Sequence, residues 1–403
     1  MAMAVPPVAL VAAFCLALTG VNLSFMVVAA LLPTLIEAWS LSDIEAGWLG
    51  GIFFAGYIAT VPVLSSLADR IDPRRIYLGS ALIGVAASLG FAAFADGFWS
   101  ALLWRFFAGV GLAGTYMPGL KAMSDNLPDA MRSRASGYYA SVFAIGSALS
   151  FIVGGEAAAG WGWRWAFVVA GLGFALAFLL IFVILPRQAA DARGAPGPFE
   201  IRPIFANRGV MAYVLANFGG LFESVGLRTW LVPYLVFLLD RPGQEPAFLS
   251  PTSIAAGIAF IGVAGAVAIS ELGERFGIRT VMIGAAIASF AVAIVTGAAV
   301  GLDYWLVVVL LAACAVLNYG RNGPTTTGAL LNADPRLQGT TMGIFAFIGF
   351  AGALVGPVAF GTALEAAGGR EDPAAWIWSF AAVAMGAALT AAAVAGLARG
   401  RSK

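Results

Sequence analysis

The sequence contains no histidine, only two cysteines and few charged residues for its length. Without histidine, a metal site built on imidazole ligands is excluded. Cys15 and Cys314 stand alone in apolar stretches, which indicates two small buried hydrophobic side chains rather than a disulfide or a metal site. The sequence also lacks a G-x-x-x-x-G-K-[ST] phosphate loop and a Ser/His/Asp constellation. We therefore expect neither an enzyme nor a bound cofactor.

What is abundant is apolar sequence. Hydrophobic residues make up 61% of the chain and charged residues 11%, with a mean hydropathy of +0.92. A soluble domain carries about 25% charged residues and could not bury this much apolar surface. The lipid bilayer is therefore the expected environment, and the net charge of +1 indicates no nucleic-acid partner.

The apolar residues fall into twelve runs, each long enough for a spanning helix of about 20 residues. They cover residues 8–36, 46–67, 76–95, 98–123, 135–158, 165–185, 209–239, 251–270, 280–301, 304–331, 338–365 and 374–397. The first run has no basic region before it, so it is interpreted as a spanning helix and not as a cleaved signal peptide.

The longest polar stretch is 186–208, which is rich in arginine, glycine and proline. We interpret it as a cytoplasmic linker between two bundles of six helices, with residues 1–185 in the N-terminal bundle and 209–403 in the C-terminal bundle.

An internal repeat supports this division. Gly137, Gly146, Ser150, Phe151 and Gly155 are followed, 206 residues later, by Gly343, Gly352, Gly356, Pro357 and Gly361. Two related halves within one membrane protein are the usual architecture of a secondary transporter, whose substrate site lies between the halves.

Lysine and arginine placement predicts the orientation. Fifteen basic residues fall in the connections on one side and three, Arg164, Arg241 and Arg370, in those on the other. We therefore expect a multi-pass protein of the cell inner membrane with both termini and the linker in the cytoplasm.

The stretch Leu67-Ala68-Asp69-Arg70, in the loop after the second run, resembles the G-x-L-A-D-R-x-G-R-K loop of the major facilitator superfamily. Its counterpart in the second half is Leu272-Gly273-Glu274-Arg275. The resemblance implies the fold of that superfamily: an all-α membrane protein with twelve transmembrane helices in two pseudo-symmetric bundles, working by alternating access. Asp69, Arg70, Glu274 and Arg275 are then expected to form a cytoplasmic gate, although a solvated interfacial loop would have the same sequence.

Arg105 begins a stretch, Arg105-Phe-Phe-Ala-Gly109-Val-Gly111, that is similar to the R-x-x-x-G-x-G pattern of the same superfamily. The resemblance implies a role in proton-coupled transport. The alternative is a structural arginine that donates hydrogen bonds to neighbouring carbonyls.

Arg228 and Arg321 also lie deep within apolar runs, where a charge is expensive. Guanidinium groups bind carboxylates in a fork, so the two arginines are predicted to form a clamp for an anion, with Asn318 and Tyr319 beside Arg321. Glu223 is the only acid deep in a run and is the expected proton-coupling group. It could instead form a salt bridge with Arg228, but a spacing of five residues separates the two by about 140° around a helix.

Asn22, Tyr57 and Tyr116 are candidates for the substrate-facing wall of the first half, although any given aromatic residue is more often packing than contact. The predicted partners are thus a small-molecule anion, protons and the bilayer, for a protein that is expected to be a monomer.

Three functions remain open from the sequence. The first is proton-coupled transport of a small organic or inorganic anion. The second is a drug/proton antiporter, which the resemblance also allows, but Ser150-Phe151 stand where the glycine pattern of such antiporters has Gly-Pro. The third is a transporter-like receptor that binds without translocation.

Overall fold

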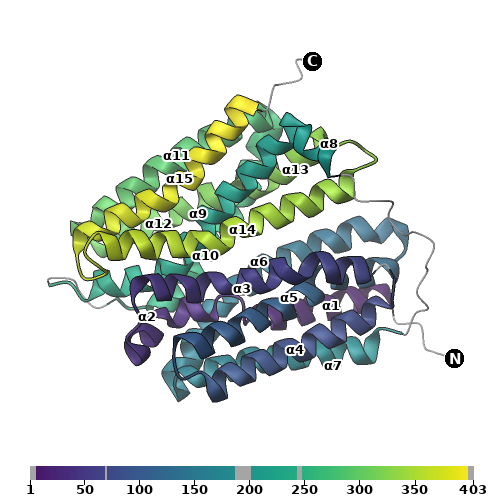
Figure 1. Cartoon of the computed structure of the whole chain (residues 1–403), viewed down its shortest axis with the longest axis horizontal. Helices are drawn as coiled ribbons and strands as arrows, with labels where there is room; N and C mark the ends of the chain where they lie inside the picture. The colour runs from purple at the N-terminus through teal and green to yellow at the C-terminus, as the bar shows by residue number, and fades with distance from the viewer. Residues whose placement is uncertain (1–5, 69, 187–200, 243–246, 398–403) are drawn as a thin grey trace. The chain divides into compact units, whose positions relative to one another are not determined.

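The computed structural model describes residues 6–68, 70–186, 201–242 and 247–397, and every regular element in these ranges is a helix (Figure 1). The helices are α1 Pro7–Asn22, α2 Val27–Trp39, α3 Asp43–Leu67, α4 Pro73–Phe94, α5 Phe98–Asp125, α6 Asp129–Trp161, α7 Trp163–Ile184, α8 Arg202–Ala206, α9 Arg208–Leu239, α10 Pro251–Phe276, α11 Ile278–Ala298, the 3₁₀ turn η1 Ala299–Gly301, α12 Tyr304–Gly320, α13 Asn322–Asn332, α14 Gln338–Ala366 and α15 Pro373–Leu397.

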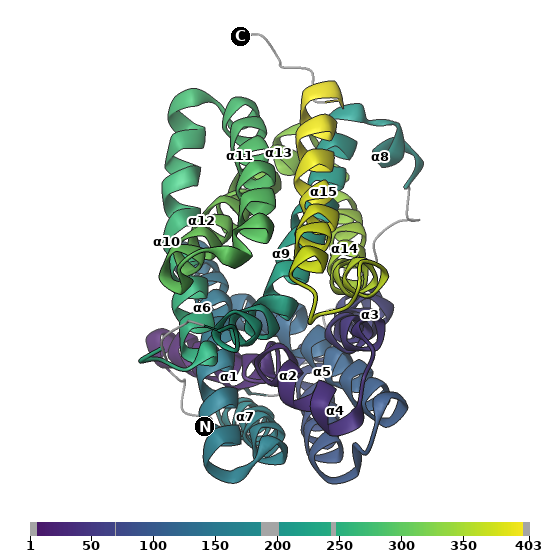
Figure 2. The same cartoon turned by 90° about the vertical axis from the view of Figure 1, so that its left-hand side faces the viewer.

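The chain forms two compact units. Unit 1 comprises residues 1–39 and 52–197, and unit 2 comprises residues 40–51 and 198–403. Within unit 1, α4 packs along α5 and α7, and within unit 2, α9 packs along α14 and α15 (Figures 1 and 2). Most of the predicted linker lies outside the described residues.

The first turns of α3 belong to unit 2 because polar contacts hold them there. Arg370 Nη1 donates to Asp43 Oδ1 over 2.7 Å, and the Arg370 backbone N–H donates to Asp43 Oδ2 over 3.2 Å. Glu365 adds a carboxylate that accepts from the backbone N–H of Ile44 at 3.0 Å. Gly369, at φ +85°, gives the loop before α15 the left-handed backbone that L side chains rarely adopt.

Eleven described helices or helix pairs are long and apolar enough to cross a membrane. The remaining predicted run forms α5, whose polar residues include Arg105 and Lys121.

The bounds of several helices agree with the offset of the sequence repeat. Adding 206 to the bounds of α5 gives 304–331, and α12 with α13 covers 304–332. Adding 206 to those of α6 gives 335–367, and α14 covers 338–366.

Glycines set the distance between some of these helices. A Cβ on Gly56 would overlap the carbonyl oxygen of Phe106, and one on Gly109 would overlap that of Phe53. The backbones of α3 and α5 therefore touch directly, as small residues permit in membranes. This contact places the Phe53 ring beside the guanidinium of Arg105.

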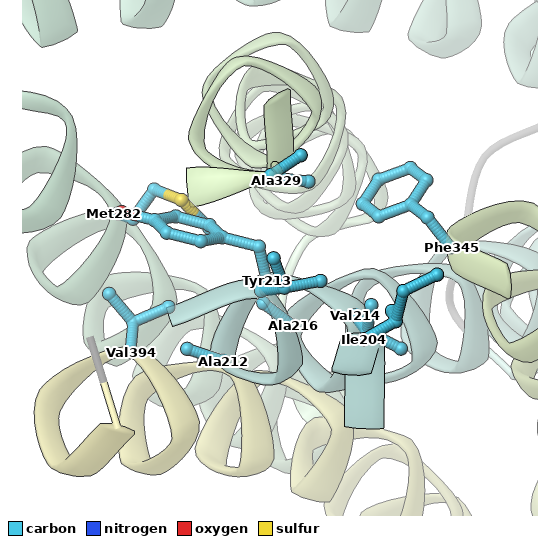
Figure 3. Packing of buried hydrophobic residues seen from close by; sticks show 11 residues of the cluster. Ile204, Ala212, Tyr213, Val214, Ala216, Met282, Ala329, Phe345 and Val394 are labelled. Atoms are coloured by element: carbon cyan, nitrogen blue, oxygen red, sulfur yellow. The ribbon is translucent and has the colours of Figure 1, made fainter. Parts of the chain in front are cut away.

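Buried apolar side chains from α8, α9, α11, α13, α14 and α15 pack into one cluster of unit 2 (Figure 3). Tyr213 of α9 lies between Met282 of α11 and Ala329 of α13, and Phe345 of α14 and Val394 of α15 complete the cluster. Gly328 leaves space for the Tyr213 ring, which a Cβ there would overlap. The short helix α8 joins this cluster through Ile204.

Two of the predicted continuous runs are interrupted. The run at 8–36 breaks at residues 23–26, between α1 and α2, and the run at 304–331 breaks at Arg321, between α12 and α13. The second break follows from Pro324, which has no N–H to continue the helical bonding of the preceding turn. The first break has no proline within it and depends on side chains from other helices.

Candidate functional site

The most buried charges in unit 2 form one ion pair between distant helices. Arg321 Nη2 donates to Glu223 Oε2, joining the α12–α13 break to α9. The Arg321 side chain is 2% exposed and that of Glu223 is 0% exposed. Ser289 of α11 donates to the second carboxylate oxygen, Glu223 Oε1, over 2.6 Å. Two helices and the α12–α13 break thus supply one carboxylate, one hydroxyl and one guanidinium to a single cluster, which we call the Glu223–Arg321–Ser289 triad.

The guanidinium of Arg321 is only partly used in this arrangement. Its Nε donates to the Leu317 carbonyl over 3.2 Å, which is a bond within its own helical turn. Its Nη1 is buried and has no hydrogen-bond partner among the described residues. The backbone carbonyl of Arg321 accepts from the Thr325 N–H at 2.9 Å and from Thr325 Oγ1 at 2.6 Å, so it is fully used within α13. One arm of the fork therefore remains available for another acceptor.

Arg228 of α9 does not pair with Glu223. It is half-buried, and its Nη2 donates to Ser224 Oγ over 3.1 Å while its Nε donates to the Ser224 carbonyl over 3.3 Å. Its guanidinium carbon lies 5.0 Å from the centre of the Tyr319 ring, in cation–π geometry. Among the described residues no carboxylate forms an ion pair with Arg228, so its charge is unpaired within this part of the chain.

Asn318 lies one turn before Arg321, on α12. Its side chain is 2% exposed, and neither amide atom has a partner among the described residues. The predicted set Arg228, Arg321, Asn318 and Tyr319 is thus spread over α9, α12 and the break after α12, and it includes two unused donors.

In unit 1, Arg105 closes the break in the first membrane span. Its Nη1 donates to the Ser24 carbonyl over 2.8 Å and its Nη2 to the Phe25 carbonyl over 3.3 Å. The guanidinium carbon also lies 4.6 Å from the centre of the Phe53 ring. Hydrogen bonds to carbonyls are what the structural alternative expects, and the role of Arg105 in proton-coupled transport stays a prediction.

Ser150 of α6 holds the same break from another side. Its hydroxyl donates to the Leu23 carbonyl over 2.7 Å and accepts from the Met26 N–H at 3.1 Å. Asn22, directly before the break, is fully buried, and neither of its amide atoms has a partner among the described residues. The sequence had marked Ser150 only as a departure from a glycine pattern.

The two predicted tyrosines of unit 1 differ in their environment. Tyr57 of α3 is buried, at 1% exposure. Tyr116 of α5 is half-buried and stacks on Tyr139 at 5.8 Å between ring centres and against Phe143 at 4.9 Å. Tyr116 therefore belongs to an aromatic cluster near the break, and packing accounts for its ring.

A family model described as Major Facilitator Superfamily matches residues 12–357 of the chain. The chain belongs to that superfamily. It is therefore a membrane transporter rather than an enzyme, as the motifs and the internal repeat indicated.

Among relatives of this superfamily member, the gentisate transporter of Corynebacterium glutamicum is 26% identical over 340 residues, which cover 80% of this chain and 73% of that one. The class H tetracycline resistance protein of Pasteurella multocida is 26% identical over 368 residues, or 85% and 84% of the two chains. In structure, the chain is similar to a bacterial homologue of the human lysosomal transporter Spinster in an inward-facing, unoccupied conformation. The TM-score is 0.79 and the identity 20%, over 98% of this chain and 99% of that one.

The residues predicted to form a cytoplasmic gate lie in loops or near helix ends where the structure describes them. Asp69 lies outside the described residues, while Arg70, Glu274 and Arg275 have exposed side chains at the ends of α3 and α10. The neighbouring Asp72 caps α4 by accepting from the Arg74 N–H at 2.9 Å.

Neither of the serines that contact Glu223 and Arg228 was predicted from the sequence as a site residue. Ser289 and Ser224 each stand in an apolar run without a recognisable motif, and their roles depend on contacts with Glu223 and Arg228. A useful signal would have been that a hydroxyl can donate to a buried carboxylate, as Ser289 does, or accept from a guanidinium, as Ser224 does.

Proposed function

We propose that this transporter moves a small organic anion together with protons, by alternating access. The observation that carries the proposal is the charge of Arg228: it is half-buried, at membrane depth, and without a carboxylate partner among the described residues. The gentisate transporter among its relatives supports an aromatic carboxylate as the first substrate to test.

The balance of charge favours an anion. Glu223 and Arg321 neutralise each other, so the three charged side chains Glu223, Arg228 and Arg321 together carry one positive charge. A region of that sign attracts carboxylates and repels lipophilic cations. The planar guanidinium of Arg228 is already oriented by Ser224 and Tyr319, so little side-chain entropy is lost when it binds.

Glu223 supplies the coupling to protons in this proposal. While Glu223 is ionised, it occupies Arg321 Nη2. Protonation of Glu223 removes the negative charge that binds Arg321 Nη2. The guanidinium of Arg321 can then donate two parallel hydrogen bonds to the substrate carboxylate. A proton and an anion would then enter together, and the pair would carry no net charge.

The test is uptake of labelled gentisate or benzoate into proteoliposomes under an inward proton gradient. We expect uptake by the unaltered protein, a loss of apparent affinity of at least about tenfold for Arg228→Ala, and a smaller loss for Arg228→Lys, which keeps the charge but not the fork. Arg336→Ala, at an exposed arginine, is the matched control. Uptake that Arg228→Ala leaves unchanged, or that ignores the proton gradient, would contradict the proposal.

The second candidate is export of amphipathic compounds by proton antiport. It is favoured by the tetracycline resistance protein, whose match extends over 84% of that relative. Export of cationic dyes without anion uptake would make it the better account. Binding without any uptake would instead support a receptor.

The remaining assignments belong to the same proposal. The protein would be a monomer of the inner membrane with cytoplasmic termini. Residues 1–185 would form the N-terminal bundle, 186–208 the cytoplasmic linker and 209–403 the C-terminal bundle. Asp69 and Arg70, with Glu274 and Arg275, would form its cytoplasmic gate.

A further inference from the structure

Polar side chains lead away from the Glu223–Arg321–Ser289 triad along one face of α12. Cys314 and Asn318 precede Arg321 by seven and three residues, so the three side chains lie on the same side of the helix. Each of them is 2% exposed. Polar side chains buried within a membrane bundle are costly, and they often mark routes for protons.

The facing side of α11 is polar at matching positions. Ser289 and Thr296, seven residues and about two turns apart, are both 0% exposed. Thr296 Oγ1 lies 3.6 Å from Cys314 Sγ, and Ser289 Oγ lies 3.5 Å from Arg321 Nη2. Seven residues along each helix, in opposite directions, separate these two contacts, so the two faces follow each other. We call the five residues Ser289, Thr296, Cys314, Asn318 and Arg321 the polar column.

Side chains alone do not make the polar column continuous. Its two contacts are about 10.5 Å apart along the helices, whereas one hydrogen bond spans about 3 Å. Asn318 lies within this interval, and both Nδ2 and Oδ1 of its amide are buried without a partner among the described residues. Arg321 Nη1, one turn further, is buried and unpaired as well. Groups of this kind hold buried water, which makes about three hydrogen bonds in proteins.

Beyond the polar column, the two ends of unit 2 differ. At the α13 end, Met282 and Ala329 belong to the apolar cluster of Figure 3. At the η1 end, the Tyr234 hydroxyl donates to the Thr296 carbonyl over 2.8 Å. Ala298, two residues after Thr296, is exposed. The polar column therefore leads from the triad toward the η1 end, which the proposed topology places outside the cell.

Glu223 needs a route for its proton because its side chain is fully enclosed. Arg321 and Ser289 are the side chains that hydrogen-bond its carboxylate among the described residues. Of the helices packed against α9, α12, α13 and α15 contain no charged residue within their bounds. Those of α8, α10 and α14 are exposed: Arg202, Glu271, Glu274, Arg275 and Glu365. The Ser289 hydroxyl is thus the neutral contact through which a proton can reach the carboxylate.

We infer that Asn318 holds a water molecule that passes protons to Glu223 through Ser289. This inference rests on the proposed function, in which Glu223 takes up the coupling proton. The water gains a proton from the Thr296 side and gives one to Ser289 Oγ, while Ser289 gives its own hydroxyl proton to Glu223 Oε1. The water and the hydroxyl keep their number of protons, and only Glu223 gains one. Asn318 is a positioning residue, since its amide orients the water and exchanges no proton.

The first test measures how fast Glu223 takes up a proton after a pH jump, from the infrared absorption of its carboxyl group in the purified full-length protein. Glu223→Gln identifies the band. We expect Asn318→Leu, which removes the amide at similar size, to slow this step at least about tenfold, and Asn318→Ser to recover part of the rate. Thr296→Val should slow it as well. Thr390→Val is the control, because this buried hydroxyl of α15 bonds to backbone carbonyls outside the polar column.

Transport in proteoliposomes gives the second readout. Net uptake of labelled benzoate under a proton gradient requires Glu223 to gain and lose a proton in every cycle, whereas exchange of internal for external benzoate does not. Asn318→Leu should therefore lower net uptake at least about tenfold and leave exchange largely unchanged. Equal loss of both would assign Asn318 to the fold or to substrate binding, and the relay would be wrong.

The outcomes also distinguish this inference from the proposed function. If Asn318→Leu and Thr296→Val leave proton uptake by Glu223 unchanged while the unaltered protein accumulates benzoate with protons, the relay is wrong and the proposed function stands. If both variants slow proton uptake but the unaltered protein transports no carboxylate, the relay stands and the anion proposal fails. A Glu223 carboxyl that never titrates overturns both the relay and its coupling role.

Discussion

At the scale of single residues, the triad is the most consequential feature of this transporter. Glu223 and Arg321 are both fully enclosed, and a buried ion pair is retained only with good geometry and further hydrogen bonds. Ser289 supplies such a bond to the carboxylate. Removing one partner would leave the other as an uncompensated charge, whereas removing both would not.

A double-mutant cycle on the pair tests this reasoning. We expect Glu223→Ala and Arg321→Ala each to destabilise the protein by about 3–5 kcal/mol, and the double variant to cost clearly less than the sum. The measurement is thermal unfolding of purified protein in detergent. Ser379→Ala serves as the control, because this buried hydroxyl of α15 donates only within its own helix. Strict additivity of the two changes would show that the pair is not energetically coupled.

At the scale of the element, one hydroxyl makes two of the hydrogen bonds that hold the interrupted first span, beside those of Arg105. Ser150 accepts from one backbone group of the break and donates to another, and no helical neighbour of Leu23 or Met26 replaces those bonds. The break is therefore a property of the α1–α2 segment together with α6, and its geometry should respond to changes in α6.

We expect Ser150→Ala and Ser150→Gly to lower the stability of the transporter by about 1–3 kcal/mol, because each leaves buried backbone groups at Leu23 and Met26 unpaired. Ser147→Ala, at another buried serine of α6, should have a smaller effect. Thermal unfolding provides the first readout, and hydrogen exchange of residues 22–27 the second. Unchanged exchange in both Ser150 variants would mean that the break persists without its hydroxyl.

At the scale of the whole molecule, the proposed topology concerns the ends of the chain and the stretch between the two halves. Basic residues favour the cytoplasmic side of a membrane, and fifteen against three is a strong asymmetry. Reporter fusions after Arg193 and after Lys403 should both be active in the cytoplasm, with a fusion after Arg241 as the matched outer-side control. An external location for either of the first two would contradict an even number of spans in each half.

The sequence by itself determined the class of protein, the repeat and the superfamily. The apolar composition predicts a protein of the lipid bilayer. The repeat offset of 206 is visible in the sequence because the duplicated helices keep their spacing. The break at Arg321 was also foreseeable in part, since Gly320, Gly323 and Pro324 weaken that helix locally.

Only the tertiary structure decided which groups meet. Glu223 pairs with Arg321, 98 residues away, and not with Arg228, five residues away, because position around a helix and not proximity in sequence selects the partner. The break at residues 23–26 depends on Arg105 and Ser150, about 80 and 124 residues distant. A continuous apolar run predicts one continuous helix. The hydrogen bonds that stabilise its interruption come from side chains of other helices, which only the packed bundle brings together.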